Sequence, residues 1–132
     1  MSKEDGLAFG LAGFVAFLVS TTYYAAFGAG LLETAFWFYA ANAFLVGGAA
    51  VFLFHAAARL RHLPRRKRVL AAGIFAAPGL IGAGVMLAVF KNVFPDWDPV
   101  SLGRYGAFVM VGHALLAGVA FDRTRKAASR AR

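Results

Sequence analysis

One histidine in a long uncharged stretch is the first residue whose surroundings suggest chemistry. His113 lies at the centre of 17 residues without a charged side chain. If this stretch crosses a membrane, the ring lies near the bilayer midplane, where an imidazole N–H without a partner is costly. We therefore expect the ring to face the interior of a helix bundle and to hydrogen-bond a side chain or backbone carbonyl of another helix.

Three polar residues from other uncharged stretches lie at a similar expected depth. A rise of about 1.5 Å per residue places Ser20, Thr21 and Asn42 within about 9 Å of His113 along the membrane normal. Ser20, Thr21, Asn42 and His113 are thus a candidate intramembrane polar cluster. Hydrogen bonding between helices is the structural interpretation, and a functional site is the alternative, because polar groups in lipid are costly unless paired.

A second candidate site lies at the expected outer ends of these stretches, and it consists of Tyr23, Tyr24, Glu33 and Arg104. Charged groups in such places commonly make headgroup contacts and surface ion pairs, each worth under about 1 kcal/mol. The alternative interpretation is a polar mouth above a substrate path, which the two tyrosines would line.

Haem, metal and nucleophile chemistry are not expected from this sequence. His55 and His113 are the natural pair of axial haem ligands, but their expected depths differ by roughly 10 Å. The chain has no cysteine, which removes thiolate ligands and thiol nucleophiles. Because no carboxylates, metal ligands or nucleophile–base pair converge, the sequence predicts neither a cofactor nor an enzyme.

The basic residues are concentrated in two runs. One contains Arg65, Arg66, Lys67 and Arg68, and the other is the tail of residues 123–132. A net charge of +8 alone would suit nucleic acid, but both runs directly flank long apolar stretches. Contacts with anionic lipid headgroups explain the two runs, so we expect a lipid bilayer as the partner and no nucleic acid.

The elements that position these residues follow from composition and from the gaps between charges. Hydrophobic residues make up 61% of the 132 residues, against about 45–50% in soluble domains. The uncharged gaps are 27, 25, 22 and 17 residues long, and a spanning helix takes about 20. We predict spans at about 6–27, 34–58, 69–90 and 102–121, the last one extended because Arg104 can reach the headgroups.

The predicted fold is therefore all-α, a membrane-embedded four-helix bundle that forms a single transmembrane domain over residues 1–132. Twelve Lys and Arg residues fall on one side of the predicted spans and two, Lys91 and Arg104, on the other. By the positive-inside rule both termini are expected in the cytoplasm, which gives an N-in, C-in protein of the cell (plasma or inner) membrane. Asp98-Pro99 also predicts where the fourth helix begins, with an acidic N-cap followed by proline.

Small residues recur four positions apart within the predicted spans. The pairs are Gly6 and Gly10, Ala43 and Gly47, Gly73 and Ala77, and Ala114 and Gly118. Small residues let helix backbones approach closely in lipid. They indicate either packing within one bundle or a seam between copies in a homo-oligomer, or with a partner membrane subunit.

Three segments carry a resemblance to a known family that covers about the last third of the chain. These are Pro78-Gly79-Leu80, Val93-Phe94-Pro95-Asp96-Trp97-Asp98-Pro99 and Arg104-Tyr105-Gly106-Ala107-Phe108. The chain resembles a family of small four-helix prokaryotic membrane proteins of unknown function. The resemblance implies the fold and the membrane location and brings no activity.

Two functions from different classes fit these observations. The first is an uncharacterised, non-catalytic integral membrane protein that acts as a packing subunit or scaffold. The second is a small oligomeric transporter or channel with a polar path in the outer half of helices one, two and four.

Overall fold

The computed structural model describes residues 1–28 and 30–129, with side chains up to residue 121. The side chains of the basic tail lie outside the described residues. The described part contains four long helices, α1 (Lys3–Phe27), α2 (Phe36–Leu60), α3 (Arg68–Val93) and α4 (Pro99–Ser129). Two short 3-10 turns, η1 (Leu32–Thr34) and η2 (Arg65–Lys67), precede α2 and α3. No strand occurs in these ranges, so the all-α four-helix prediction is confirmed.

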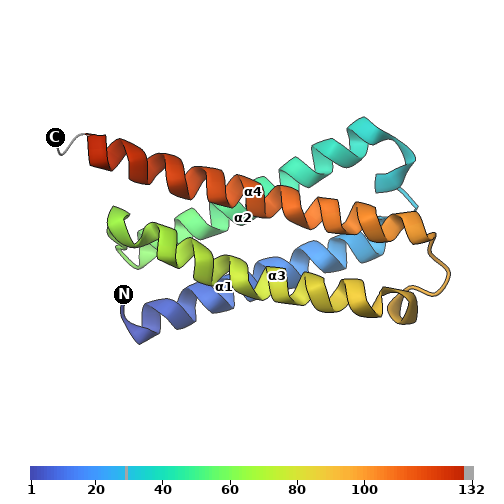
Figure 1. Cartoon of the computed structure of the whole chain (residues 1–132), viewed down its shortest axis with the longest axis horizontal. Coiled ribbons are helices and arrows are strands. Elements are labelled where there is room, and N and C mark those ends of the chain that lie inside the picture. Colours follow the sequence, from blue (N-terminus) through green and yellow to red (C-terminus); the bar gives the residue numbers. More distant parts are fainter. Residues whose placement is uncertain (29, 130–132) are drawn as a thin grey trace.

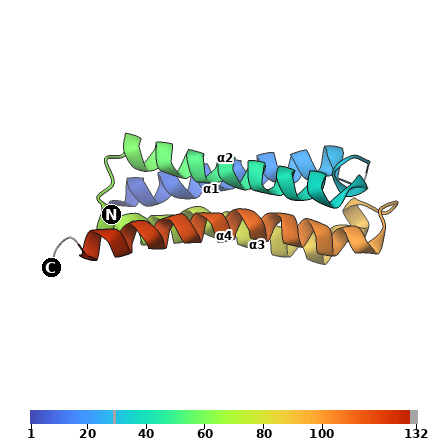
Figure 2. The same ribbon diagram turned by 90° about the horizontal axis from the view of Figure 1, so that it is seen from above.

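The four helices lie roughly along one axis in two layers, with α1 and α2 in one and α3 and α4 in the other (Figure 2). The most extensive contacts are made by α1 with α3 and by α2 with α4. The start of α1, η2 and the end of α4 lie at one end, and η1 and the α3–α4 loop lie at the other (Figure 1). These are called the η2 end and the η1 end below.

All four helices are long and apolar enough to cross a membrane. Only 11% to 22% of the residues in each apolar window are buried inside the bundle, so most of these residues keep part of their surface exposed. Such a surface is stable when lipid rather than water surrounds it. The helices extend a few residues beyond most of the predicted spans.

Side-chain caps explain where two of the helices begin. Ser2 and Asp5 form a reciprocal capping box at the start of α1. The Asp98 carboxylate accepts a hydrogen bond from the Val100 N–H at 2.8 Å, and α4 begins at Pro99. The Asp98-Pro99 prediction is therefore confirmed.

Glycines allow close approach where helices cross inside the bundle. A Cβ atom at Gly13 would lie 1.9 Å from the Phe75 carbonyl oxygen of α3, and one at Gly47 would lie 2.9 Å from the Gly112 Cα of α4. By contrast, a Cβ at Gly73 or Gly118 would have no atom within 4 Å. The small residues thus divide into a set used within the bundle and a set that faces outward.

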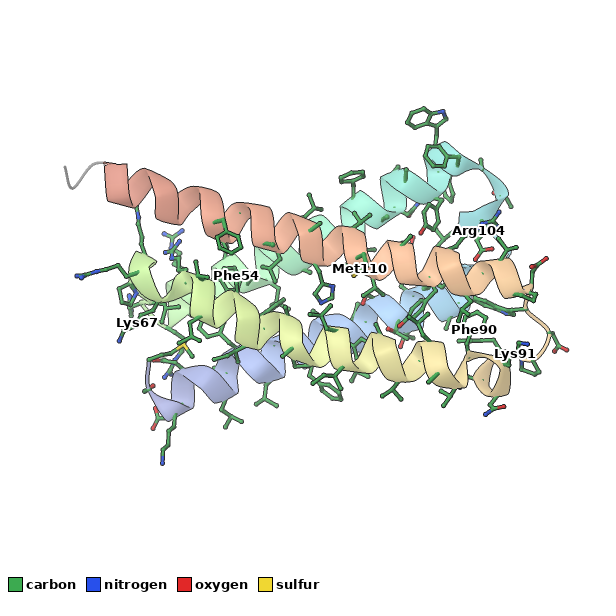
Figure 3. The ribbon with its side chains drawn as sticks, in the orientation of Figure 1. Phe54, Lys67, Phe90, Lys91, Arg104 and Met110 are labelled. Atoms are coloured by element: carbon green, nitrogen blue, oxygen red, sulfur yellow. The ribbon has the colours of Figure 1, made fainter. Side chains whose placement is uncertain are left out.

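The core has two parts, one in each half of the bundle. Toward the η2 end, Phe54 packs against Phe9 and Phe75, with ring centroids 5.6 and 5.7 Å apart. Toward the η1 end, the core is built around Tyr24 and Phe90 with several further aromatic rings. Figure 3 labels Phe54 and Phe90 in these two halves.

Candidate functional site

Glu33 carries the most enclosed charged side chain at the η1 end among the described residues. Its side chain is 6% exposed, although it lies in the short turn η1 between two long helices. The turn is held because the Glu33 N–H donates to the Gly28 carbonyl at 2.9 Å and Leu32 is fully buried. Glu33 forms the expected ion pair, with Arg104, but the turn folds its carboxylate inward, so the carboxylate does not lie on the surface.

Three donors surround this carboxylate. The Tyr24 hydroxyl donates to Oε1, while the Ser101 hydroxyl and Arg104 Nη1 donate to Oε2 at 2.7 and 2.8 Å. The Tyr39 hydroxyl donates to the backbone carbonyl of Arg104. These five residues, here called the Glu33 network, connect α1, η1, α2 and α4 at one level of the bundle, where Figure 3 labels Arg104.

The network keeps Glu33 ionised at neutral pH. Burial by itself would raise the pKa of this carboxyl group, but hydrogen bonds from Tyr24, Ser101 and Arg104 outweigh that effect and lower its pKa. The positive charge of Arg104 acts in the same direction. A buried charge of this kind is stable only while it is paired and hydrogen-bonded.

Aromatic rings cover the network on its bundle side. The ring of Tyr24 is 1% exposed and lies 5.4 Å from Tyr105, 5.1 Å from Phe108 and 6.0 Å from Trp97, measured between centroids. Trp97 stacks in turn on Phe94 at 4.5 Å. Because the rings exclude water, the hydrogen bonds to Glu33 act in a medium of low dielectric constant and are strengthened.

A cleft of about 290 Å³ opens beside the network between α2 and α4. Glu33, Tyr39 and Arg104 line it together with Ala35, Phe36, Gly103 and Ala107. The Arg104 side chain is 47% exposed, so it is the charged group of the network with the greatest access to this cleft.

His113 lies at the middle of the bundle and contacts two backbone carbonyls. Its Nδ1 lies 2.9 Å from the Val109 oxygen on its own helix, and its Nε2 lies 3.3 Å from the Ala76 oxygen on α3. The ring packs on Gly79, where a Cβ would come within 2.9 Å of Nε2. The inward-facing ring and the contact with another helix agree with expectation. A neutral ring can donate to only one of the two carbonyls.

The residues expected to join His113 have other partners. The Ser20 hydroxyl donates to the Phe17 carbonyl, Thr21 pairs with the Tyr105 hydroxyl at 3.0 Å, and Asn42 accepts from Tyr23 at 2.7 Å. Tyr23 therefore faces Asn42 and not Glu33. Counting residues along a helix gives an expected depth, but it does not fix the rotation of each helix about its axis.

Ser20 and His113 do share one small cavity of about 50 Å³ in the bundle centre. Its other walls are apolar side chains and the backbone of glycines, including Gly47 and Gly79. A water molecule needs roughly 10–15 Å³ of such space. The cavity can hold a few waters near His113 and is too small for an organic solute.

Metal ligands do not gather in the part of the chain that the structure describes. No three His, Asp or Glu side chains there lie close enough to hold an ion. The Nδ1 of His55 lies 2.9 Å from the Val51 carbonyl of its own helix. The basic run lies at the η2 end, with Arg65, Arg66 and Lys67 exposed and Arg68 half-buried at the start of α3.

The sequence reasoning did not include Ser101, Tyr39 or Tyr105 in either candidate site. Ser101, Arg104 and Tyr105 are spaced i, i+3 and i+4 on α4, which puts them on one helix face. That spacing, directly after the Asp98-Pro99 cap, was the signal that could have joined Ser101 and Tyr105 to Arg104.

Comparison with known proteins gives one match. A family model described as a family of unknown function (DUF5367) matches residues 31–127, a segment that contains Glu33, Ser101 and Arg104 but not Tyr24. No curated protein and no solved structure matches the chain. Since the matched segment covers more than two thirds of the sequence, the chain belongs to the DUF5367 family of unknown function.

Proposed function

We propose that this chain is a non-catalytic membrane protein that acts as a packing subunit or scaffold, joined to further copies of itself or to a partner membrane subunit. One observation carries the proposal. The bundle uses some small residues for its own crossings and leaves another set, at Ala114 and Gly118 of α4, on its outer surface. Small residues on a lipid-facing helix are typical of contacts between membrane helices.

The interior supports the same conclusion. The carboxylate of Glu33 receives its hydrogen bonds from Tyr24, Ser101 and Arg104 of the same chain, so it needs no ligand to balance its charge. The central cavity of about 50 Å³ has room for a few waters only. This central cavity is therefore too small to serve as a binding chamber for an organic solute.

Association through α4 can be tested by changing its outer face alone. Gly118→Leu should reduce dimers or larger assemblies, measured by native mass spectrometry from lipid nanodiscs, while the helix content stays unchanged. Gly84→Leu is the matched control, because Gly84 is also exposed with no atom near its position on α3. A protein that is monomeric at every concentration, alone and in its native membrane, would contradict the proposal.

We further propose that the η2 end faces the cytoplasm of the cell (plasma or inner) membrane. The support is the bias of twelve Lys and Arg residues to two, and the exposed Arg65, Arg66 and Lys67 then meet anionic headgroups. The chain has no cysteine, so single cysteines report cleanly. Gly30→Cys should react with an impermeant thiol reagent in intact cells, and Arg66→Cys only after permeabilisation. The reverse pattern would invert the assignment.

A small oligomeric transporter or channel is the second candidate function. The cleft of about 290 Å³ beside Glu33 and Arg104 favours it, since clefts of neighbouring copies could meet around a shared polar path. Proteoliposomes loaded with a pH-sensitive or chloride-sensitive dye test this function directly. Ion flux that disappears in Arg104→Gln would support transport, whereas flux equal to that of empty liposomes would leave only the packing role.

A further inference from the structure

A second cleft, of about 430 Å³, opens at the η2 end. Four of its six lining residues carry guanidinium or imidazole groups, namely His55, Arg59, His62 and Arg68. They come from three consecutive parts of the chain, the last two turns of α2, the loop after it and the first residue of α3. No acidic side chain lines this cleft among the described residues.

The loop that carries His62 has a defined geometry. At the end of α2, the His62 N–H donates to the Arg59 carbonyl at 3.1 Å, and the Leu63 N–H donates to the Ala58 carbonyl at 2.9 Å. This pair of hydrogen bonds is the Schellman arrangement, which closes many helices with a left-handed residue. Leu63 is 4% exposed and anchors the turn in the core.

His62 occupies the left-handed position of that turn, with φ 46°. Glycine adopts this conformation without steric cost and is the usual residue there, whereas a β-carbon makes it unfavourable. Among the described residues, His62 is the one non-glycine residue with positive φ. An imidazole held in an unfavourable backbone conformation at the rim of a cationic cleft suggests that its side chain is used.

Two acidic residues at this end whose side chains the structure describes, Glu4 and Asp5, are engaged elsewhere. Arg61 points away from the cleft and pairs with Asp5 at 2.9 Å and with Glu4 at 3.6 Å. Those carboxylates therefore bind Arg61 at the start of α1, and two arginines, Arg59 and Arg68, line the cleft. Like charges gathered in this way favour an anion between them.

The donor set fits a phosphate group. Guanidinium groups bind phosphate oxygens through two parallel N–H donors, and the imidazole N–H of His62 can add a single hydrogen bond. The Nδ1–H of His55 already donates to the Val51 carbonyl at 2.9 Å. His55 lies one helical turn before Arg59 on α2, so the inner end of the cleft lies toward the membrane interior. We propose that this cleft binds the phosphate group of an anionic ligand, either a lipid headgroup or a soluble phosphate.

This inference is separate from association through α4 and from general contact between the basic run and the membrane. The test uses the full chain in phosphatidylcholine nanodiscs with and without phosphatidic acid, and inorganic phosphate as the soluble probe. Binding is followed by native mass spectrometry of retained lipid and by the shift of the unfolding temperature with each probe.

The informative variants are His62→Gly and Arg59→Gln. Glycine suits the left-handed position, so His62→Gly should keep the turn and the fold while it weakens phosphatidic acid or phosphate binding about tenfold or more. Lys3→Gln is the control, because Lys3 is an exposed cation at the same end of the bundle and does not line the cleft. We expect less than a threefold change in this control.

The two probes separate the sources of the phosphate group. A response to phosphatidic acid that excess inorganic phosphate does not reduce identifies a lipid ligand, and a response to inorganic phosphate identifies a soluble one. Equal losses in cleft and control variants would show diffuse surface attraction and overturn the proposal. The absence of any response to both probes would overturn it as well.

Discussion

The two halves of the bundle are held together by different interactions. Toward the η1 end, the Glu33 network joins α1, η1, α2 and α4 through hydrogen bonds and an ion pair. Toward the η2 end, the core is apolar, with Phe9, Phe54 and Phe75 packed together near the close crossing at Gly13. The half toward the η1 end therefore depends on charge, and the half toward the η2 end depends on shape, that is, on close packing between helices.

This difference shows how helices acquire specific partners in lipid. Burying an apolar side chain between helices brings little gain there, because lipid tails are as apolar as the core. Specificity then comes either from polar groups that cannot be left alone in hydrocarbon or from backbones that fit only when glycine allows it. This chain uses polar groups in the half toward the η1 end and glycine-dependent backbone contact in the half toward the η2 end.

The largest expected effect comes from a substitution that disrupts the close packing of α1 against α3 in the shape-dependent half. Gly13→Val would place a Cβ 1.9 Å from the Phe75 carbonyl oxygen, and neither backbone can move without separating α1 from α3. We expect destabilisation beyond about 4 kcal/mol, measured by denaturant unfolding in mixed micelles. Gly10→Ala is the control on the same helix, since its Cβ would lie at an ordinary 3.9 Å from Ile74. A mild effect of Gly13→Val would show that this crossing is loose.

The next largest effect is expected from a substitution that disrupts the Glu33 network in the charge-dependent half. Glu33→Ala leaves the hydroxyls of Tyr24 and Ser101, both 1% exposed, without their acceptor. We expect a loss of about 2–3 kcal/mol in unfolding free energy. Glu4→Ala is the matched control, because Glu4 is 86% exposed and pairs with Arg61 only at 3.6 Å. A loss in Glu33→Ala no greater than in the control would mean that the network contributes nothing.

Acid should weaken the two halves unequally. The pKa of Glu33 is lowered in the folded protein, so its contribution is present above the unfolded value of about 4.3 and is lost as the pH falls through the folded value. The unfolding temperature should therefore drop below about pH 4.3. The part of this drop that belongs to Glu33 should be missing in Glu33→Gln. Identical acid profiles for the two proteins would be inconsistent with the network.

The smallest expected effect lies where the two halves meet. His113→Phe removes the contact with the Ala76 carbonyl at 3.3 Å, and we expect a loss of about 1 kcal/mol, within the range for hydrogen bonds between membrane helices. His113→Gln keeps a donor and should lose less. Thermal unfolding of both variants in the same lipid provides the comparison. A stabilised His113→Phe protein would show that filling the cavity matters more than the hydrogen bond.

The sequence was sufficient to predict the four helices but insufficient to predict the Glu33 network. Charge gaps and the Asp98-Pro99 cap locate the four helices because a membrane requires long uncharged segments and a cap has a local signature. The inward turn of Glu33 depends on how η1 folds back after α1, which no local pattern encodes. The partners of Thr21 and Asn42 depend on helix rotation, which is fixed by crossings such as Gly13 with Phe75.

The most direct test of the charge-dependent half is a double-mutant cycle between Glu33 and Arg104. The unfolding free energies of the wild type, Glu33→Gln, Arg104→Gln and the double variant are compared at neutral pH in one lipid mixture. We predict a coupling energy of at least about 1 kcal/mol, because the Glu33 carboxylate is buried and bonded to Arg104 at 2.8 Å. Additive single effects, with a coupling energy near zero, would contradict the account.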